Sequence, residues 1–341
     1  MTPRGRVSAA LRGLPVDRVP AGPLAVHYCA RLAGMSLKDY TLSAERMAGA
    51  VVAYARAFQP DAVWISADTW VTAEAMGAEV AFTEDNQPLG GKGPPVVRGA
   101  GDVRVIPTPD VARRGRYPLM VEATRRIRDS LGENVFLVAC FDQYPFSAAC
   151  ALLGIDRAMI ATREEPDLLD ATMRKAADYA VIYGTALAEA GADMLSGGDS
   201  PAGLLGPKMY AEVAAPIERG VIERLRAATG LPVSLHICGD ARRLLSAMAD
   251  TGAAVLELDY KVNIVQAIEA CGDKVALWGN LDPVGLLQDA PPEQVAEQTR
   301  RLIRDVGQTG FTRFVASSGC TLTVGTPQEN LLAFFDAVRE R

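Results

Sequence analysis

The sequence predicts an α/β fold, a (β/α)8 TIM barrel that occupies residues 1–341 as a single domain. Eight short runs rich in β-branched and apolar residues recur along the chain. Most of these runs are separated by a segment whose apolar residues have helical spacing, and such alternation is typical of a barrel built on a parallel sheet. A length of 341 residues fits one large barrel or two ordinary domains, so a doubly wound two-domain fold is the alternative.

Each expected strand ends in small or polar residues. In chain order the eight strands are residues 23–27, 62–66, 135–141, 192–196, 232–238, 254–259, 275–280 and 314–318. The expected helices are residues 117–131, 168–190, 209–229, 241–251, 264–271 and 292–309. Gly191 and Gly230 follow two of these helices, which fits the preference for glycine just past a helix end.

The connection after the second strand, residues 67–134, is much longer than a single crossover helix needs. Its middle, residues 88–95, is dense in proline and glycine. We interpret this connection as an extended insertion that passes over the barrel mouth and ends in the helix 117–131. A plain surface loop is the alternative.

Composition excludes several classes of protein. The formal charge is −6, from 35 Lys and Arg against 41 Asp and Glu, whereas a nucleic-acid surface needs clustered positive charge. The arginine clusters 113–116 and 125–128 are expected on solvated faces. No apolar run is long enough for a membrane span, and the N-terminal residues lack the apolar core of a signal peptide. Six cysteines are too few for a disulfide scaffold, so we expect a cytoplasmic protein without a nucleic-acid or membrane partner.

The segment Ser234–Asp240 carries the strongest chemical signal. His236 and Cys238 are two residues apart on an expected strand, so both side chains point to the same face. The carboxyl end of a barrel strand opens at the catalytic mouth, and Cys320 follows the last strand at the corresponding end. One imidazole and two thiolates favour Zn²⁺, and three protein ligands leave a coordination position open for substrate. The alternative is that these cysteines are small buried apolar residues.

The remaining cysteines have no histidine at ligand spacing and are expected in the core. They are Cys29, Cys140, Cys150 and Cys271.

Other expected strand ends carry a polar residue in the same layer. We expect Asp199, Asp259 and Asn280 to act in catalysis. The residues expected to bind substrate are His27, Asp68, Asp142 and Asp282. Each Asp or Asn also has an alternative role as a helix cap, and Asp282, just before Pro283, fits a cap better than a reactant. Asp259 is either an exchangeable fourth zinc ligand or a partner of the ligands.

Together these segments resemble the uroporphyrinogen decarboxylase superfamily, and within it the zinc-dependent, corrinoid-linked methyltransferases. The resemblance covers nearly the whole chain, on the segments 17–20, 68 with 74–77, 235–239, 279–283 and 319–330. The pair His236 and Cys238 with the distant Cys320 matches the zinc motif of those methyltransferases, which the decarboxylases are not expected to carry. The arginine-rich substrate signature of the decarboxylases is replaced here by Val26–Arg31.

The resemblance implies transfer of a methyl group between a methylated corrinoid and a zinc-activated thiol or other small acceptor. The sequence lacks an Asp-x-His-x-x-Gly corrinoid-ligating motif, so the co-substrate is expected to be free cobalamin or to belong to a separate corrinoid protein. Transfer in the opposite direction, from a methylated small molecule to the corrinoid, stays open. The alternatives are a decarboxylase of this superfamily, a lyase or hydrolase that uses zinc-bound water, and a protein with a purely structural zinc.

Overall fold

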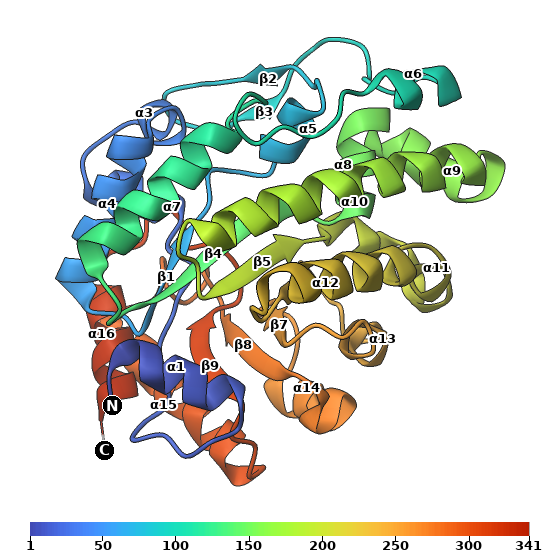
Figure 1. The fold of residues 1–341 in the computed structure, drawn as a ribbon. Coiled ribbons are helices and arrows are strands. Elements are labelled where there is room, and N and C mark those ends of the chain that lie inside the picture. Colours follow the sequence, from blue (N-terminus) through green and yellow to red (C-terminus); the bar gives the residue numbers. More distant parts are fainter. Residues whose placement is uncertain (341) are drawn as a thin grey trace.

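The computed structural model describes residues 1–340. Seven parallel strands form one curled sheet, in the order β1-β4-β5-β6-β7-β8-β9 (Figure 1). Their bounds are β1 (Ala62–Ile65), β4 (Phe136–Gln143), β5 (Met194–Gly198), β6 (Ser234–Ile237), β7 (Val255–Leu258), β8 (Ala276–Leu281) and β9 (Phe314–Ser318). Every strand after the first therefore pairs with its predecessor in this sheet, as in a TIM barrel. The two remaining strands, β2 (Val80–Ala81) and β3 (Leu89–Gly90), form a short antiparallel pair within the insertion.

Helices surround the sheet, most of them on its outer face. In the first half of the chain they are α1 (Pro3–Leu11), α2 (His27–Leu32), α3 (Leu37–Thr41), α4 (Ala44–Phe58), α5 (Val71–Ala75), α6 (Ala100–Val105), α7 (Tyr117–Leu131), α8 (Pro145–Leu153) and α9 (Ile155–Glu164). In the second half they are α10 (Pro166–Glu189), α11 (Gly206–Val213), α12 (Ala215–Thr229), α13 (Leu245–Ala249), α14 (Ile264–Cys271), α15 (Pro292–Gln308) and α16 (Gln328–Arg339), with the 3-10 turns η1 (Ser200–Leu204) and η2 (Gly272–Lys274). Helix α10 lies between α7 and α12 (Figure 1). No helix within residues 1–340 has the length and apolar character needed to cross a bilayer.

The prediction of a first strand at residues 23–27 is wrong. An extended segment, residues 20–24, takes its place and closes the sheet between β9 and β1. The Gly22 N–H donates to the Ala316 carbonyl (3.0 Å) and the Ala316 N–H to the Pro20 carbonyl (2.9 Å). On the other side, the Asp61 N–H donates to the Ala21 carbonyl (2.8 Å). The barrel seam is therefore hydrogen-bonded on both edges, although only Ala21 forms a β-bridge.

Proline explains why the ladder stops so early. Pro23 has no N–H to donate, and the Ala25 N–H turns back to the Pro23 carbonyl (2.8 Å). His27, expected at the end of a strand, is instead the first residue of α2.

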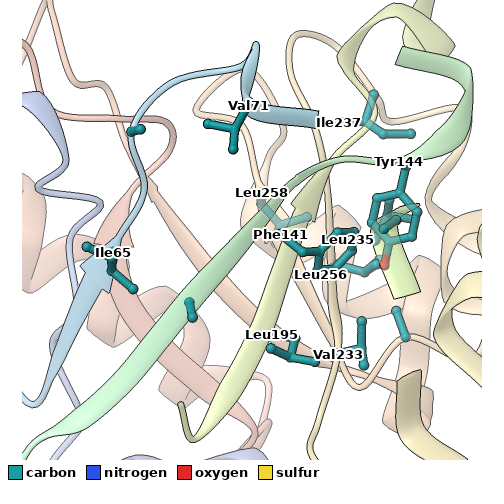
Figure 2. Packing of buried hydrophobic residues seen from close by; sticks show 14 of the residues in the cluster. Ile65, Val71, Phe141, Tyr144, Leu195, Val233, Leu235, Ile237, Leu256 and Leu258 are labelled. Atoms are coloured by element: carbon teal, nitrogen blue, oxygen red, sulfur yellow. The ribbon is translucent and has the colours of Figure 1, made fainter. Parts of the chain in front are cut away.

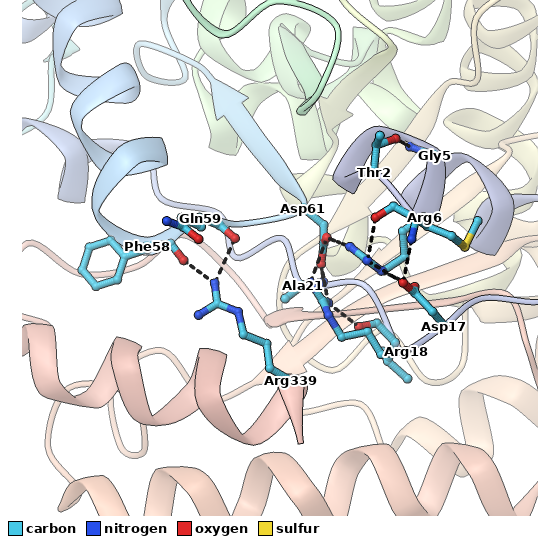
Figure 3. A network of polar contacts seen from close by, with 12 residues as sticks. Thr2, Gly5, Arg6, Asp17, Arg18, Ala21, Phe58, Gln59, Asp61 and Arg339 are labelled. Carbon is cyan, nitrogen blue, oxygen red and sulfur yellow. Dashed lines mark hydrogen bonds and ion pairs between the residues drawn. The ribbon is translucent and has the colours of Figure 1, made fainter. Parts of the chain in front are cut away.

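The carboxylate of Asp61 anchors the seam (Figure 3). This side chain is buried and accepts hydrogen bonds from the Ala21 N–H (2.8 Å), from Arg18 Nη1 (2.6 Å) and from Arg6. Two guanidinium groups and one backbone donor thus satisfy a carboxylate that would otherwise be costly to bury.

Gly22 lies where three side-chain donors converge on one carbonyl. Its oxygen accepts from Trp278 Nε1 (2.8 Å), Trp64 Nε1 (3.3 Å) and Ser317 Oγ (3.0 Å). A Cβ at this position would lie 2.6 Å from the Trp278 ring. The close approach of the seam to the barrel interior therefore requires glycine.

Two apolar clusters lie on the two faces of the sheet. Alternate strand residues such as Trp64, Val138 and Trp278 fill the barrel interior, and Val7 and Leu11 of α1 pack against them. The opposite set packs under the helices (Figure 2). The labelled members there include Ile65, Phe141, Leu195, Leu235, Leu256 and Leu258. The period-two pattern of the strands thus separates an inner core from an outer one.

Two further expectations need correction. The expected helix 209–229 is two helices, α11 and α12, which meet at Ala214. Pro216 cannot donate to the preceding turn, which explains the break. The arginine clusters are not wholly solvated. Arg116 is 5% exposed, and Arg128 donates to Asp193 (2.6 Å) with a side chain that is 11% exposed.

Candidate metal centre

His236, Cys238 and Cys320 converge at the carboxyl end of the barrel. His236 lies on β6, Cys238 directly follows that strand, and Cys320 follows β9. His236 Nε2 lies 2.9 Å from Cys238 Sγ, and the two sulfurs are 3.8 Å apart. One potential ligand atom from each residue falls within 4.8 Å of the others. The structure therefore brings together the three residues that the sequence suggested as ligands.

The spacing of the sulfurs suits a tetrahedral Zn²⁺. Two Zn–S bonds of about 2.3 Å at the tetrahedral angle separate the sulfurs by about 3.8 Å, the distance found between Cys238 and Cys320. The contact of 2.9 Å between His236 and Cys238 is a direct hydrogen bond. Tetrahedral ligands would keep these two atoms about 3.6 Å apart, so a bound ion requires only a small outward movement of the imidazole or the thiol.

Backbone contacts set the tautomer of His236. Its Nδ1 lies 2.9 Å from the carbonyl oxygen of Glu257. Because a carbonyl oxygen can only accept, Nδ1 carries a proton, and Nε2 is the nitrogen that faces Cys238. This is the usual arrangement of a metal-binding histidine.

The three groups also perturb one another's protonation. A hydrogen bond with Cys320 lowers the pKa of Cys238 to about 7 against the effect of burial, and the same contact, together with burial, raises the pKa of Cys320 to about 12. Burial disfavours the charged form of His236, but Cys320 and Glu257 outweigh it and raise its pKa to about 9. One thiol of the pair is thus much more easily deprotonated than the other.

Asp259 shapes the loop that carries Cys238. Its Oδ2 accepts from the Gly239 N–H (2.7 Å), and its Oδ1 accepts from the Lys261 N–H (2.9 Å). Asn280 extends this network, because its Nδ2 donates to the Asp259 carbonyl (3.0 Å). Backbone N–H groups thus engage both carboxylate oxygens of Asp259.

The sequence reasoning missed Glu257. This residue lies inside the barrel one layer below Asp259, is 3% exposed, and accepts hydrogen bonds from Ser196 Oγ (2.8 Å) and Ser234 Oγ. Burial raises its pKa. Glu257 has the same strand parity as Asp259, so an acidic residue in the middle of an apolar strand was the available signal.

Asp68 lies in a buried ion cluster with two insertion residues. Arg116 pairs with both oxygens of Asp68 and with Glu74 Oε2 (2.7 Å). Asp68 Oδ1 also accepts from the Trp70 N–H (2.8 Å). This cluster, Asp68–Glu74–Arg116, therefore fixes the segment that leads from β1 into α5.

Asp142 and Asp282, both expected to bind substrate, instead hold backbone. Asp142 is buried, and its Oδ2 accepts from the Thr72 N–H (2.7 Å) in the first turn of α5. Burial raises the pKa of this carboxyl to about 8. Asp282 Oδ1 accepts from the Val284 and Gly285 N–H groups (2.9 and 3.0 Å), so the alternative of a turn cap describes it correctly.

Asp199, expected to be catalytic, lies behind the barrel wall. It is fully buried and accepts from the Ser147 N–H (2.7 Å) and from Ser147 Oγ (2.6 Å). Burial raises the pKa of Asp199 to about 6.

His27 was expected to bind substrate. Its Nε2 donates to the Ala67 carbonyl (2.6 Å), and burial lowers the pKa of the imidazole, which favours its neutral form.

A cavity of about 410 Å³ lies at the carboxyl ends of β4 and β5; we call it the mouth cavity. It is lined by Thr69, Trp70, Gln143, Ser147, Cys150, Ala151, Gly154, Ile155, Ser200 and Pro201. Ser200 follows Asp199, whose N–H donates to the His236 carbonyl (2.8 Å). Gly90 of β3, in the antiparallel pair of the insertion, packs so closely against the Trp70 ring that a Cβ on this residue would lie 2.4 Å from the ring.

Comparison with known proteins gives two kinds of relative. The family model described as uroporphyrinogen decarboxylase (URO-D) matches residues 2–341. Methylcobamide:CoM methyltransferase MtbA of Methanosarcina acetivorans is 30% identical, with 97% of this chain and 95% of the relative aligned. A uroporphyrinogen decarboxylase of Alkalilimnicola ehrlichii is 31% identical, with 98% and 93% aligned.

A solved structure supports the fold over nearly the whole chain. A methyltransferase from Methanosarcina mazei superimposes with a TM-score of 0.89 at 26% identity, and covers 99% of this chain and 98% of its own. The expected TIM-barrel class is therefore confirmed.

Proposed function

The chain belongs to the uroporphyrinogen decarboxylase family, and within this family we propose that it is a methyltransferase that moves a methyl group between a corrinoid and a small sulfur compound. His236, Cys238 and Cys320 would hold the Zn²⁺ on which this activity depends. The observation that carries the proposal is the convergence of one imidazole and two thiols, with a sulfur–sulfur distance of 3.8 Å, at the catalytic end of the barrel.

The donor set also favours methyl transfer over decarboxylation. Two thiolates and an imidazole suit a soft, thiol-binding ion such as zinc. Decarboxylation has no use for such a thiol-activating centre, whereas an acceptor thiol does, because only a few per cent of a free thiol is ionised at neutral pH. When bound, Zn²⁺ would supply the positive charge that favours the thiolate form of the acceptor.

The transfer balances without a further reactant. The acceptor thiol releases its proton to solvent, and a lone pair of its sulfur forms the new S–C bond with the methyl carbon. The Co–C bond of the corrinoid breaks with both electrons remaining on cobalt, which leaves Co(I). The reverse transfer demethylates the thioether.

The chain's own residues would orient this reaction. The Glu257 carbonyl holds the His236 tautomer, and Asp259 holds the loop of Cys238. The corrinoid would be free cobalamin or the cofactor of a separate protein. A cytoplasmic location is part of the proposal, since the thiols of the centre must stay reduced.

Metal analysis and a spectroscopic assay test the proposal together. The purified protein should contain about one zinc per chain, and adding thiols with methylcobalamin should change the cobalt spectrum. Cys238→Ser and Cys320→Ser should lose both properties, whereas Cys271→Ser, a buried cysteine outside the centre, should keep them. Full metal content in both variants would exclude this ligand set. Full zinc without a spectral change for any thiol would overturn methyl transfer in favour of a hydrolase or lyase that uses zinc-bound water.

A further inference from the structure

A second cavity, of about 940 Å³, lies at the amino ends of the strands; we call it the basal groove. Residues that immediately precede strands line it, namely Asp193 before β5, Ala254 before β7 and Arg313 before β9. Helix α1 and its flanking residues, from Thr2 to Arg12, provide one wall. The candidate metal centre lies at the carboxyl ends of the strands, so the basal groove has no part in the function proposed above.

Positive charge is concentrated in the basal groove. Five cationic side chains line it, whereas Asp193 is the one carboxylate in the lining formed by the described residues. The five are Arg4, Arg12, Arg226, Lys274 and Arg313. Because the whole chain has a formal charge of −6, this excess of positive charge is a local feature.

Two of the five cations are already neutralised. Arg4 pairs with Asp193 (2.6 Å) and with Glu133, and Lys274 pairs with Asp250 (2.7 Å). Asp193 also pairs with a second arginine outside the groove (2.6 Å). The carboxylate in the lining is therefore fully engaged and leaves the other three cations uncompensated.

Those three guanidinium groups, of Arg12, Arg226 and Arg313, have no carboxylate partner within residues 1–340 and donate to backbone carbonyls instead. Arg12 Nε donates to a carbonyl of α1 (3.0 Å), and Arg226 Nη1 donates to the Gly252 carbonyl (3.3 Å). Arg313 Nε donates to the Leu11 carbonyl (3.1 Å), and its Nη1 donates to a carbonyl of η2. Each guanidinium has five N–H donors, so these contacts orient the groups and leave most donors free.

We propose that the basal groove binds the linear polyphosphate group of a small anionic ligand. A guanidinium fork matches the oxygens of a phosphate, and three such groups, on three separate elements, require a ligand with several charges along its length. A single phosphate or carboxylate would leave part of the set unused. The volume of about 940 Å³ is that of a small-molecule site. Inorganic polyphosphate and nucleoside triphosphates share this chemistry.

Calorimetric titration of the zinc-loaded protein with tripolyphosphate tests the proposal. The titration should reveal a single saturable site. Arg12→Gln and Arg226→Gln should each weaken the affinity by at least about tenfold, the effect of losing a hydrogen bond to a charged group. Both side chains are exposed, so neither substitution disturbs the core. No saturable binding up to about 1 mM, or full affinity in both variants, would overturn the inference.

Arg56 provides the matched control for Arg226. Each residue is an exposed arginine in the last turn of a 15-residue helix, Arg56 in α4 and Arg226 in α12. Arg56→Gln therefore removes the same charge from an equivalent helix position, but outside the groove. It should leave the affinity unchanged. Equal weakening in Arg56→Gln and Arg226→Gln would show a response to net charge alone and overturn the inference.

Three further titrations define the ligand. Tighter binding of ATP than of tripolyphosphate would identify a nucleotide site, and equal or weaker binding would identify a site for free polyphosphate; both results support the inference. Tighter binding of citrate would overturn it. Polyphosphates also bind zinc, so Cys238→Ser should bind tripolyphosphate as the parent does. Loss of binding in this variant would place the anion at the metal centre, which overturns the inference and leaves the proposed function intact.

Discussion

Replacing Arg116 by alanine should destabilise the protein far more than a typical arginine substitution. The guanidinium pairs with Asp68 and Glu74, lies over the Phe82 ring at 4.9 Å, and is 5% exposed. The Asp68 side chain is 0% exposed, so the variant would leave an uncompensated charge in the protein interior. Breaking a buried pair in this way typically costs about 3–5 kcal/mol.

This cost corresponds to a measurable shift in the unfolding temperature. A chain of 341 residues has an unfolding entropy of about 0.7 kcal/mol/K, so Tm should fall by about 4–7 °C. Asp68 also accepts from the Trp70 N–H. The loss of Arg116 should therefore alter Trp70 fluorescence as well as stability.

Arg125 of α7 is the matched control. Its side chain is 54% exposed and pairs with Glu122 at the surface, so Arg125→Ala should change stability by at most about 1 kcal/mol. Differential scanning calorimetry of the two variants makes the comparison. The double variant Arg116→Met with Asp68→Asn should recover part of the loss, because it removes both charges. Equal Tm values for Arg116→Ala and Arg125→Ala would refute the assignment of a buried ion cluster.

Three further predictions follow from other contacts. Burial raises the pKa of Asp142 to about 8, far above that of an unfolded aspartate, so its neutral form stabilises the fold in full below about pH 4, and this contribution is lost as the pH rises through 8. Asparagine suits the φ of 78° at this position. The stability of Asp142→Asn relative to the parent should therefore increase with pH between about 4 and 8, by up to about 1.4 kcal/mol per pH unit. If urea unfolding gave the same stability difference between variant and parent at about pH 5 and at about pH 8, this prediction would be contradicted. Gly22→Ala should lower the free energy of unfolding by about 1–3 kcal/mol, because the added Cβ would overlap the Trp278 ring. Gly49→Ala, on α4 with open space around its Cβ, should not destabilise the protein. Equal melting temperatures for the two variants would disprove the overlap. Asp259→Ala should weaken zinc affinity by about 10–100-fold in a chelator competition, and unchanged affinity would show that the loop of Cys238 needs no such support.

Local patterns were enough to predict most of the sheet. Strands β1 and β4 to β9 lie within two residues of the expected runs, because each run combines apolar character with a small or polar end. The prediction of a strand at residues 23–27 was wrong because the segment has the composition of a strand, but Pro23 interrupts the hydrogen-bond ladder. Similarly, Pro216 divides a stretch whose apolar spacing alone reads as one helix.

The convergence of His236, Cys238 and Cys320 was predictable because two of these residues come from the same strand segment. Period two places His236 and Cys238 on one face, and the barrel brings Cys320 alongside. Polar residues at strand ends were less informative, since Asp142 and Asp282 cap backbone in the same positions where substrate-binding groups would lie. The partnership of Arg116 with Asp68 spans 48 residues, and no local pattern marks it.

The barrel seam also determines when the fold can be completed during synthesis. The carbonyl of Gly22 accepts a hydrogen bond from the hydroxyl of Ser317, a residue 295 positions later. The backbone of Pro20 and Gly22 pairs with that of Ala316. Until β9 has left the ribosome, the N-terminal segment lacks this partner, and the edges of β1 and β8 are open. Such unpaired edges favour association with other chains. The nascent chain therefore spends most of its translation as an open sheet, and ring closure between its first and last tenths is a late step of its folding.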